Sequence, residues 1–110
     1  MSNWSDWMPM PSPENARKIT GPLGAGVYQI RNKLNNQLIQ FGESKNCQKR
    51  MQSLFPKPYG LGTRNNESKR KYILEFWKVL EYRTLEVKSK EEAVKIDREL
   101  KAQNNHLFNT

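Results

Sequence analysis

Basic and aromatic side chains alternate with prolines and glycines in the segment from Pro56 to Glu67. Lys and Arg side chains bind backbone phosphates, and an aromatic ring can stack on an exposed base. This composition predicts a loop that faces nucleic acid, although Tyr59 could equally close the edge of the core. The residues that we predict to bind nucleic acid are Lys45, Lys49, Lys57, Tyr59, Arg64 and Asn65.

The distribution of charge favours a polyanionic partner. The chain has 19 Lys and Arg residues against 11 Asp and Glu, which gives a net charge of +8. Residues 15–66 carry nine of the bases and one acid, Glu43, whereas the residues after them are nearly balanced. A basic segment gains affinity for nucleic acid because the bound phosphates release their counterions. The alternative is a solvated basic surface that only keeps the protein in solution.

Several other functional classes are poorly supported by the sequence. No apolar run approaches the roughly 20 residues that span a bilayer, and the first residues lack the pattern of a signal peptide. We therefore expect a cytoplasmic protein that makes no membrane contact. Cys47 is the only cysteine, which excludes an internal disulfide and argues against a thiolate zinc site. A nucleophilic pair of Cys47 and His106 is formally possible.

The strand signals predict a small α+β fold. Residues 26–43 predict a β-hairpin, because β-branched and aromatic residues flank the turn formers Asn35 and Asn36. Residues 79–87 alternate well enough to form a third strand. The expected architecture is a small three-stranded antiparallel or mixed sheet flanked by helices.

Three helices are expected around this sheet. The first begins near Cys47 and is stopped by Pro56, and a short second helix covers residues 71–77. The third covers about residues 90–104, because Ser89 and the glutamate three positions later form a capping-box signature.

The prolines divide the chain into two parts. Pro9, Pro11 and Pro13 predict that residues 1–20 are extended and lie outside any helix, packed on the body of the protein through two tryptophans. Residues 21–110 are expected to form a single domain.

Four short motifs follow one another across that domain. They are Gly26-Val27-Tyr28, Gln40-Phe41-Gly42, Arg50 eight positions after Gly42, and the terminal Leu107-Phe108-Asn109. In order and spacing they resemble the GIY-YIG nuclease family, and the stretch GVYQIRNKLNNQ is particularly similar to the catalytic module of phage intron homing endonucleases. Gln40 stands where the second motif of the family has a tyrosine.

The resemblance implies a metal-dependent endonuclease. Phosphodiester cleavage requires an activated water, a cation that absorbs developing charge, and a fixed in-line geometry. By the resemblance, Tyr28 would be the general base or the relay to one, and Arg50 would hold the scissile phosphate. Asn109 would orient a carboxylate or a water. Gln40 cannot act as an acid, but it could still donate a hydrogen bond.

The family also implies a carboxylate on the last helix that binds one divalent metal, Mg²⁺ or Mn²⁺. Asp97, twelve positions before Asn109, fits the spacing in several branches of the family, whereas Glu99 preserves the residue type. We favour Asp97 over Glu99 as the metal ligand.

Three functions follow from these observations. The first is an endonuclease that hydrolyses nucleic acid, with DNA expected ahead of RNA, and with a possible homodimer because one site cuts one strand at a time. The second is a catalytically impaired nucleic-acid-binding module that keeps the fold, which the replacement at Gln40 suggests. The third is a small basic scaffold protein that shares only short motifs with the family.

Overall fold

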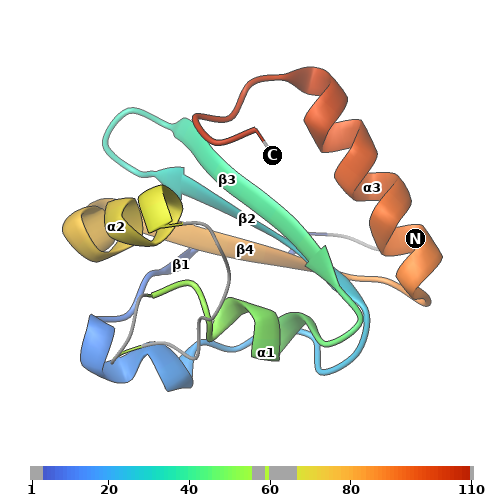
Figure 1. Ribbon diagram of the computed structural model, residues 1–110, viewed down its shortest axis with the longest axis horizontal. Coiled ribbons are helices and arrows are strands. Elements are labelled where there is room, and N and C mark those ends of the chain that lie inside the picture. Colours follow the sequence, from blue (N-terminus) through green and yellow to red (C-terminus); the bar gives the residue numbers. More distant parts are fainter. Residues whose placement is uncertain (1–3, 56–58, 60–66, 110) are drawn as a thin grey trace.

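The computed structural model describes residues 4–55, 59 and 67–109, and it contains one antiparallel sheet of four strands in the order β1-β4-β2-β3. Helices α1 and α2 lie on one side of this sheet and α3 lies on the other (Figure 1). The strands are β1 (Met8–Pro9), β2 (Gly26–Asn32), β3 (Gln37–Ser44) and β4 (Leu80–Glu86). The predicted α+β class is confirmed, with one more strand than the three that were expected.

The hairpin of β2 and β3 forms where the sequence predicts it. Asn36 adopts a left-handed conformation with φ of 58°, which asparagine tolerates better than most residues. The side-chain oxygen of Asn35 accepts a hydrogen bond from the backbone N–H of Gln37. Tyr28 pairs with Gly42 across the two strands. The turn chemistry therefore brings the first and second motifs side by side.

Two apolar clusters hold the helices against the two faces of the sheet. Tyr28, Ile30, Met51, Phe55 and Ile73 belong to the cluster on the side of α1 and α2. The second cluster lies against α3 (Lys90–Gln103) and contains Val27, Phe41, Leu85, Val87, Ala93 and Leu100. Because side chains alternate along a strand, β2 and β3 supply both clusters at once.

The helices differ from the prediction mainly at their ends. The first, α1 (Cys47–Met51), ends before Phe55 because the N–H groups of Ser53 and Leu54 bond three residues back, which tightens the chain into turns. The second, α2 (Glu67–Phe76), begins earlier than expected, and a 3₁₀ turn follows it (Trp77–Val79).

The predicted third helix is present as α3, and its cap has the expected geometry. The side-chain oxygen of Ser89 accepts a hydrogen bond of 3.2 Å from the backbone N–H of Glu92. At the other end Asn104 is left-handed, with φ of 50°, and closes the helix. Within the described part of the chain, no helix is long and apolar enough to cross a membrane.

The first residues fold more than their prolines predict. Met8 and Pro9 form β1 against β4, and Pro13–Lys18 form a 3₁₀ helix with proline in its first turn, where the missing N–H is not needed. The expectation of extended backbone outside any helix is therefore wrong for residues 13–18. The guanidinium of Arg83 lies 4.4 Å from the ring centre of Trp4 and 4.6 Å from that of Trp7, which attaches the segment to β4.

Candidate active site

The side chain of Tyr28 lies on β2 and is held against β3. It is buried, and a Cβ atom added to Gly42 would stand 2.5 Å from its hydroxyl oxygen. The ring therefore occupies the space that a side chain at position 42 would need. The absence of a side chain at Gly42 therefore leaves room for the phenol.

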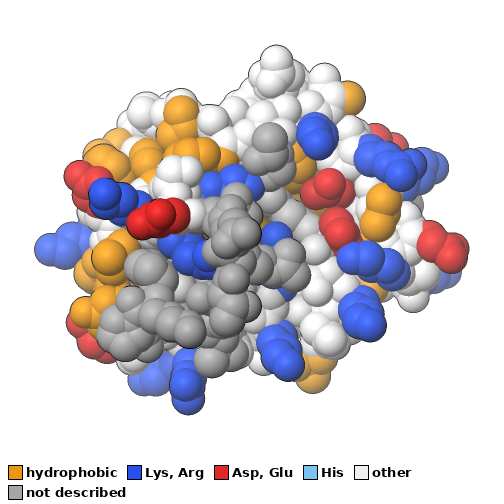
Figure 2. Space-filling model, viewed as in Figure 1, with side chains coloured by type: hydrophobic (Ala, Val, Ile, Leu, Met, Phe, Trp, Pro, Cys, Tyr) orange, Lys and Arg blue, Asp and Glu red, His pale blue; other side chains and the backbone are white. Residues whose placement is uncertain are grey.

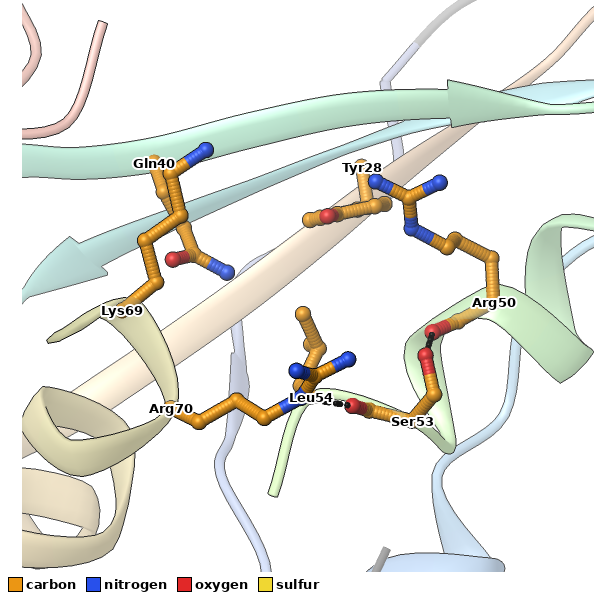
Figure 3. Close-up of a pocket in the computed structure, with 7 residues that line it drawn as sticks. All are labelled: Tyr28, Gln40, Arg50, Ser53, Leu54, Lys69 and Arg70. Atoms are coloured by element: carbon orange, nitrogen blue, oxygen red, sulfur yellow. Dashed lines mark hydrogen bonds between the residues drawn. The ribbon is translucent and has the colours of Figure 1, made fainter. Parts of the chain in front are cut away.

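A pocket opens beside this ring, and Figure 3 shows the side chains that line it. Its volume is about 30 Å³. The strands β2 and β3, the helix α1 with the turn after it, and the start of α2 each contribute to its wall. The lining residues are Tyr28, Gln40, Arg50, Ser53, Leu54, Lys69 and Arg70.

The pocket is strongly cationic. Arg50, Lys69 and Arg70 line it, and none of the seven lining residues is an acid. Burial, followed by the nearby charge of Arg50, lowers the pKa of Lys69. An anion in the pocket would relieve the repulsion between these cations. The electrostatics therefore suit a phosphate group.

Hydrogen bonds link Arg50 on α1 to Ser53 in the turn that follows, and link Ser53 to Arg70 on α2. The Ser53 hydroxyl donates to the backbone carbonyl of Arg50 over 2.6 Å. Arg70, which is 9% exposed, donates through Nε to the carbonyl of Ser53 over 3.2 Å. The buried arginine of α2 thus supports the turn that follows the predicted phosphate ligand.

The pocket thereby brings together residues of the first motif, the second motif and the helix arginine. Residues 24–109 match the model of the GIY-YIG catalytic domain. The chain belongs to the GIY-YIG family. No curated protein and no solved structure matches it. The family is one of nucleases, so the domain implies a nuclease activity that acts on nucleic acid.

The two candidate metal ligands of this GIY-YIG domain lie in different environments on α3. Asp97 is half-buried, whereas Glu99 is exposed. Burial, followed by the charge of Glu43 on β3, raises the pKa of Asp97, and Arg50 and Lys69 oppose this shift. The charges of Arg50 and Lys69, on the pocket wall, therefore act on the Asp97 carboxylate.

The carboxylate of Asp97 is unpaired in the described part of the chain. Within residues 4–55 and 67–109, its carboxylate has neither a hydrogen bond nor an ion pair with the protein. The same part of the chain holds no group of three or more His, Cys, Asp or Glu side chains that could enclose a metal. Mg²⁺ commonly binds through one or two carboxylates, with water and substrate phosphates as its other ligands. The donor set fits such an open site and does not fit a closed protein cage.

Asn109 lies away from the pocket wall. Its amide donates to the carbonyl of Lys101 over 2.9 Å, near the end of α3, and its own oxygen is buried without a hydrogen-bond partner in the described structure. The adjacent Phe108 donates its backbone N–H to the carbonyl of Ile39. These contacts tie the fourth motif, Leu107-Phe108-Asn109, to both α3 and β3.

The predicted nucleic-acid ligands are only partly described. Lys57, Arg64 and Asn65 lie outside the described residues. Lys45, which precedes α1, and Lys49, in the last turn of α1, are exposed, and Tyr59 is 37% exposed. Figure 2 shows Lys and Arg side chains around the centre of the face on which α1, α2 and α3 border β3.

The pair of Cys47 and His106 does not form a nucleophilic site. Burial raises the pKa of the Cys47 thiol to about 12, so the thiolate is scarce at neutral pH. His106 contacts Gln29 over 2.9 Å and the ring of Phe41, on the face of the sheet opposite the pocket.

Sequence reasoning missed three polar residues of the pocket. They are Ser53, Lys69 and Arg70. The run of bases after Ser68 was a signal of positive charge at the start of α2, but nothing local shows that this helix packs beside β3.

Proposed function

We propose that this chain is a metal-dependent endonuclease that hydrolyses phosphodiester bonds in DNA in preference to RNA. One observation carries the proposal: Tyr28 and Arg50, from separate motifs, line one pocket whose charged side chains are all cations. The preference for DNA rests on the similarity of the β2 sequence to phage intron homing endonucleases.

Arg50 binds the scissile phosphate in this proposal. Its guanidinium is permanently charged and presents N–H groups in a plane that matches two phosphate oxygens. Lys69 adds a second positive charge in the same pocket, and the two cations together favour the pentacovalent transition state, whose charge exceeds that of the bound diester.

Tyr28 accepts the proton of the attacking water. Its hydroxyl lies at the pocket, in a ring fixed by Gly42, so it needs no rearrangement to meet the substrate. Asp97 would hold the metal, and the metal would supply Lewis-acid stabilisation of the charge on the phosphate.

A binding module without efficient hydrolysis is the second candidate function. Gln40 occupies the position of the second-motif tyrosine and removes one phenol from the pocket. The basic face would still bind nucleic acid through its phosphates. In the first function, cutting both strands would require a second copy of the chain or a second encounter, because one site cuts one strand at a time.

The two functions are separated by cleavage and binding assays on one set of proteins. Supercoiled plasmid, single-stranded DNA and RNA are incubated with the wild type in Mg²⁺, Mn²⁺ or EDTA. Arg50→Ala is compared with Arg98→Ala, which removes an exposed arginine of α3. We expect nicking that needs metal and is lost in Arg50→Ala alone. Salt-sensitive binding without nicking by the wild type would favour the binding module.

A further inference from the structure

Gln40 has an unusual environment for a polar side chain. It is 2% exposed, and its Oε1 atom has no hydrogen-bond partner among the residues that the structure describes. Buried polar atoms in folded proteins are nearly always paired, because an unpaired one loses its hydration without compensation. An apolar side chain of similar shape would avoid that loss. Packing alone therefore does not account for glutamine at this position.

The backbone of β3 turns this side chain into the pocket. Ile30 pairs with Gln40, whereas the next residue, Arg31, pairs with Leu38, so Ile39 is an extra residue that makes a bulge. Bulges beside active sites re-aim the side chains next to them. Figure 3 shows the amide of Gln40 pointing into the pocket from β3.

The chemistry of the pocket wall identifies what this amide oxygen binds. Arg50, Lys69 and Arg70 only donate hydrogen bonds, so they hold phosphate oxygens but cannot hold the protons of a water. The attacking water needs acceptors for those protons. Tyr28 Oη is one acceptor on the wall, and Gln40 Oε1 is a buried second one. The volume of about 30 Å³ exceeds the roughly 10–15 Å³ that a water requires.

We propose that Gln40 positions the attacking water by accepting a hydrogen bond from it at Oε1. This assignment rests on the nuclease function proposed above, and it gives Gln40 a role that the tyrosine of the second motif would otherwise fill. Gln40 is a positioning residue in this account, because the proton leaves the water through Tyr28.

The reaction step balances with these two residues. Tyr28 first releases its hydroxyl proton to solvent, and the water oxygen then forms a bond to phosphorus as one water proton passes to Tyr28 Oη. The second proton stays on the water oxygen, hydrogen bonded to Gln40. The bond from phosphorus to the departing sugar oxygen breaks, and that oxygen takes a proton from solvent. Tyr28 ends in its starting protonated form, so the net reaction adds one water to one diester.

The test compares thermal stability with cleavage. Gln40→Met keeps the length of the side chain and removes the acceptor, and Gln37→Met makes the same change at an exposed position of β3. We expect Gln40→Met to raise the Tm of the metal-free protein by about 3–5 °C, because the unpaired oxygen is gone. We expect the same variant to lower kcat for plasmid nicking by about 10- to 100-fold with little change in KM. Gln37→Met should leave both quantities unchanged.

A second variant tests whether the acceptor itself matters. Gln40→Glu keeps an oxygen acceptor at the same reach, and we expect it to recover cleavage that Gln40→Met loses. An unchanged kcat in Gln40→Met, a lowered Tm that matches its loss of activity, or equal loss in both variants would overturn the assignment while leaving the nuclease function standing. Absence of metal-dependent nicking by the wild type would overturn the nuclease function and the assignment together.

Discussion

The hydroxyl oxygen of Tyr28 lies 2.5 Å from the point at which a Cβ atom would stand on Gly42. The two residues face each other across β2 and β3, and they belong to the first and second motifs. The first and second motifs thus each contribute one of two adjacent residues, a tyrosine and the glycine that leaves space for its ring. The glycine leaves room for the proposed base beside the cationic pocket.

Substituting Gly42 should displace that phenol. Gly42→Ala places a methyl group inside the space of the ring, so we expect a loss of about 1–3 kcal/mol in the free energy of unfolding and loss of nicking activity. Gly24→Ala is the matched control, because a Cβ there meets nothing within 4 Å. Chemical denaturation and plasmid nicking measure both effects. A Gly42→Ala protein with unchanged stability and activity would show that the ring has room to move.

Lys69 should contribute to binding through its charge. Lys69→Met removes the charge and keeps the aliphatic stem, so we expect it to bind a short DNA duplex in EDTA more weakly. The slope of log K against the logarithm of the salt concentration should be smaller in magnitude by about 0.9. Lys71→Met, an exposed lysine on the same helix, is the control. Fluorescence anisotropy at several salt concentrations measures both slopes. Identical slopes for Lys69→Met and the wild type would place Lys69 outside the phosphate contact.

The choice between the two acidic residues of α3 can be made by metal binding. Asp97→Asn removes a half-buried carboxylate on which the charges of Arg50 and Lys69 act. We expect the affinity for Mn²⁺, in the presence of a non-cleavable DNA analogue, to fall by at least about 10-fold. Glu99→Gln changes an exposed side chain and should bind Mn²⁺ like the wild type. Calorimetric titration measures both affinities. Equal losses in the two variants would leave Asp97 without a special role.

His106 should make the fold sensitive to acid. The Gln29 amide nitrogen can only donate, so His106 Nε2 accepts and the ring is neutral, while Gln29 Oε1 accepts from Arg83 over 2.8 Å. Burial lowers the pKa of His106, so below the unfolded value of about 6.5 the unfolded chain binds more protons than the folded one. Stability should therefore be complete above about pH 6.5 and fall as the pH drops through this value.

The variant His106→Gln isolates this contribution. It keeps a polar side chain but cannot titrate, so the difference in unfolding free energy between wild type and variant should shrink as the pH falls from 7.5 to 5. Urea denaturation at each pH measures it. A difference that does not change with pH would show that His106 has the same pKa in the folded and unfolded states.

The local parts of the fold were predictable from the sequence, and the contacts between distant parts were not. The hairpin and the cap of α3 follow from Asn36 and Ser89, whose side chains act within a few residues. Strand β1 has only two residues, too few for an alternating pattern, and its pairing to β4 depends on the tertiary fold. Tyr28 and Arg50 were found through motif spacing. Lys69 was not, because its place in the pocket depends on how α2 packs beside β3.

Nicking of supercoiled plasmid by Tyr28→Phe in Mn²⁺ tests the central claim most directly. This variant removes one hydroxyl, and Tyr72→Phe removes another from a half-buried tyrosine of α2 outside the pocket. We predict that wild type and Tyr72→Phe form open-circular plasmid only when the metal is present, and that Tyr28→Phe is slower by at least about 100-fold. Equal rates for Tyr28→Phe and the wild type would contradict the account.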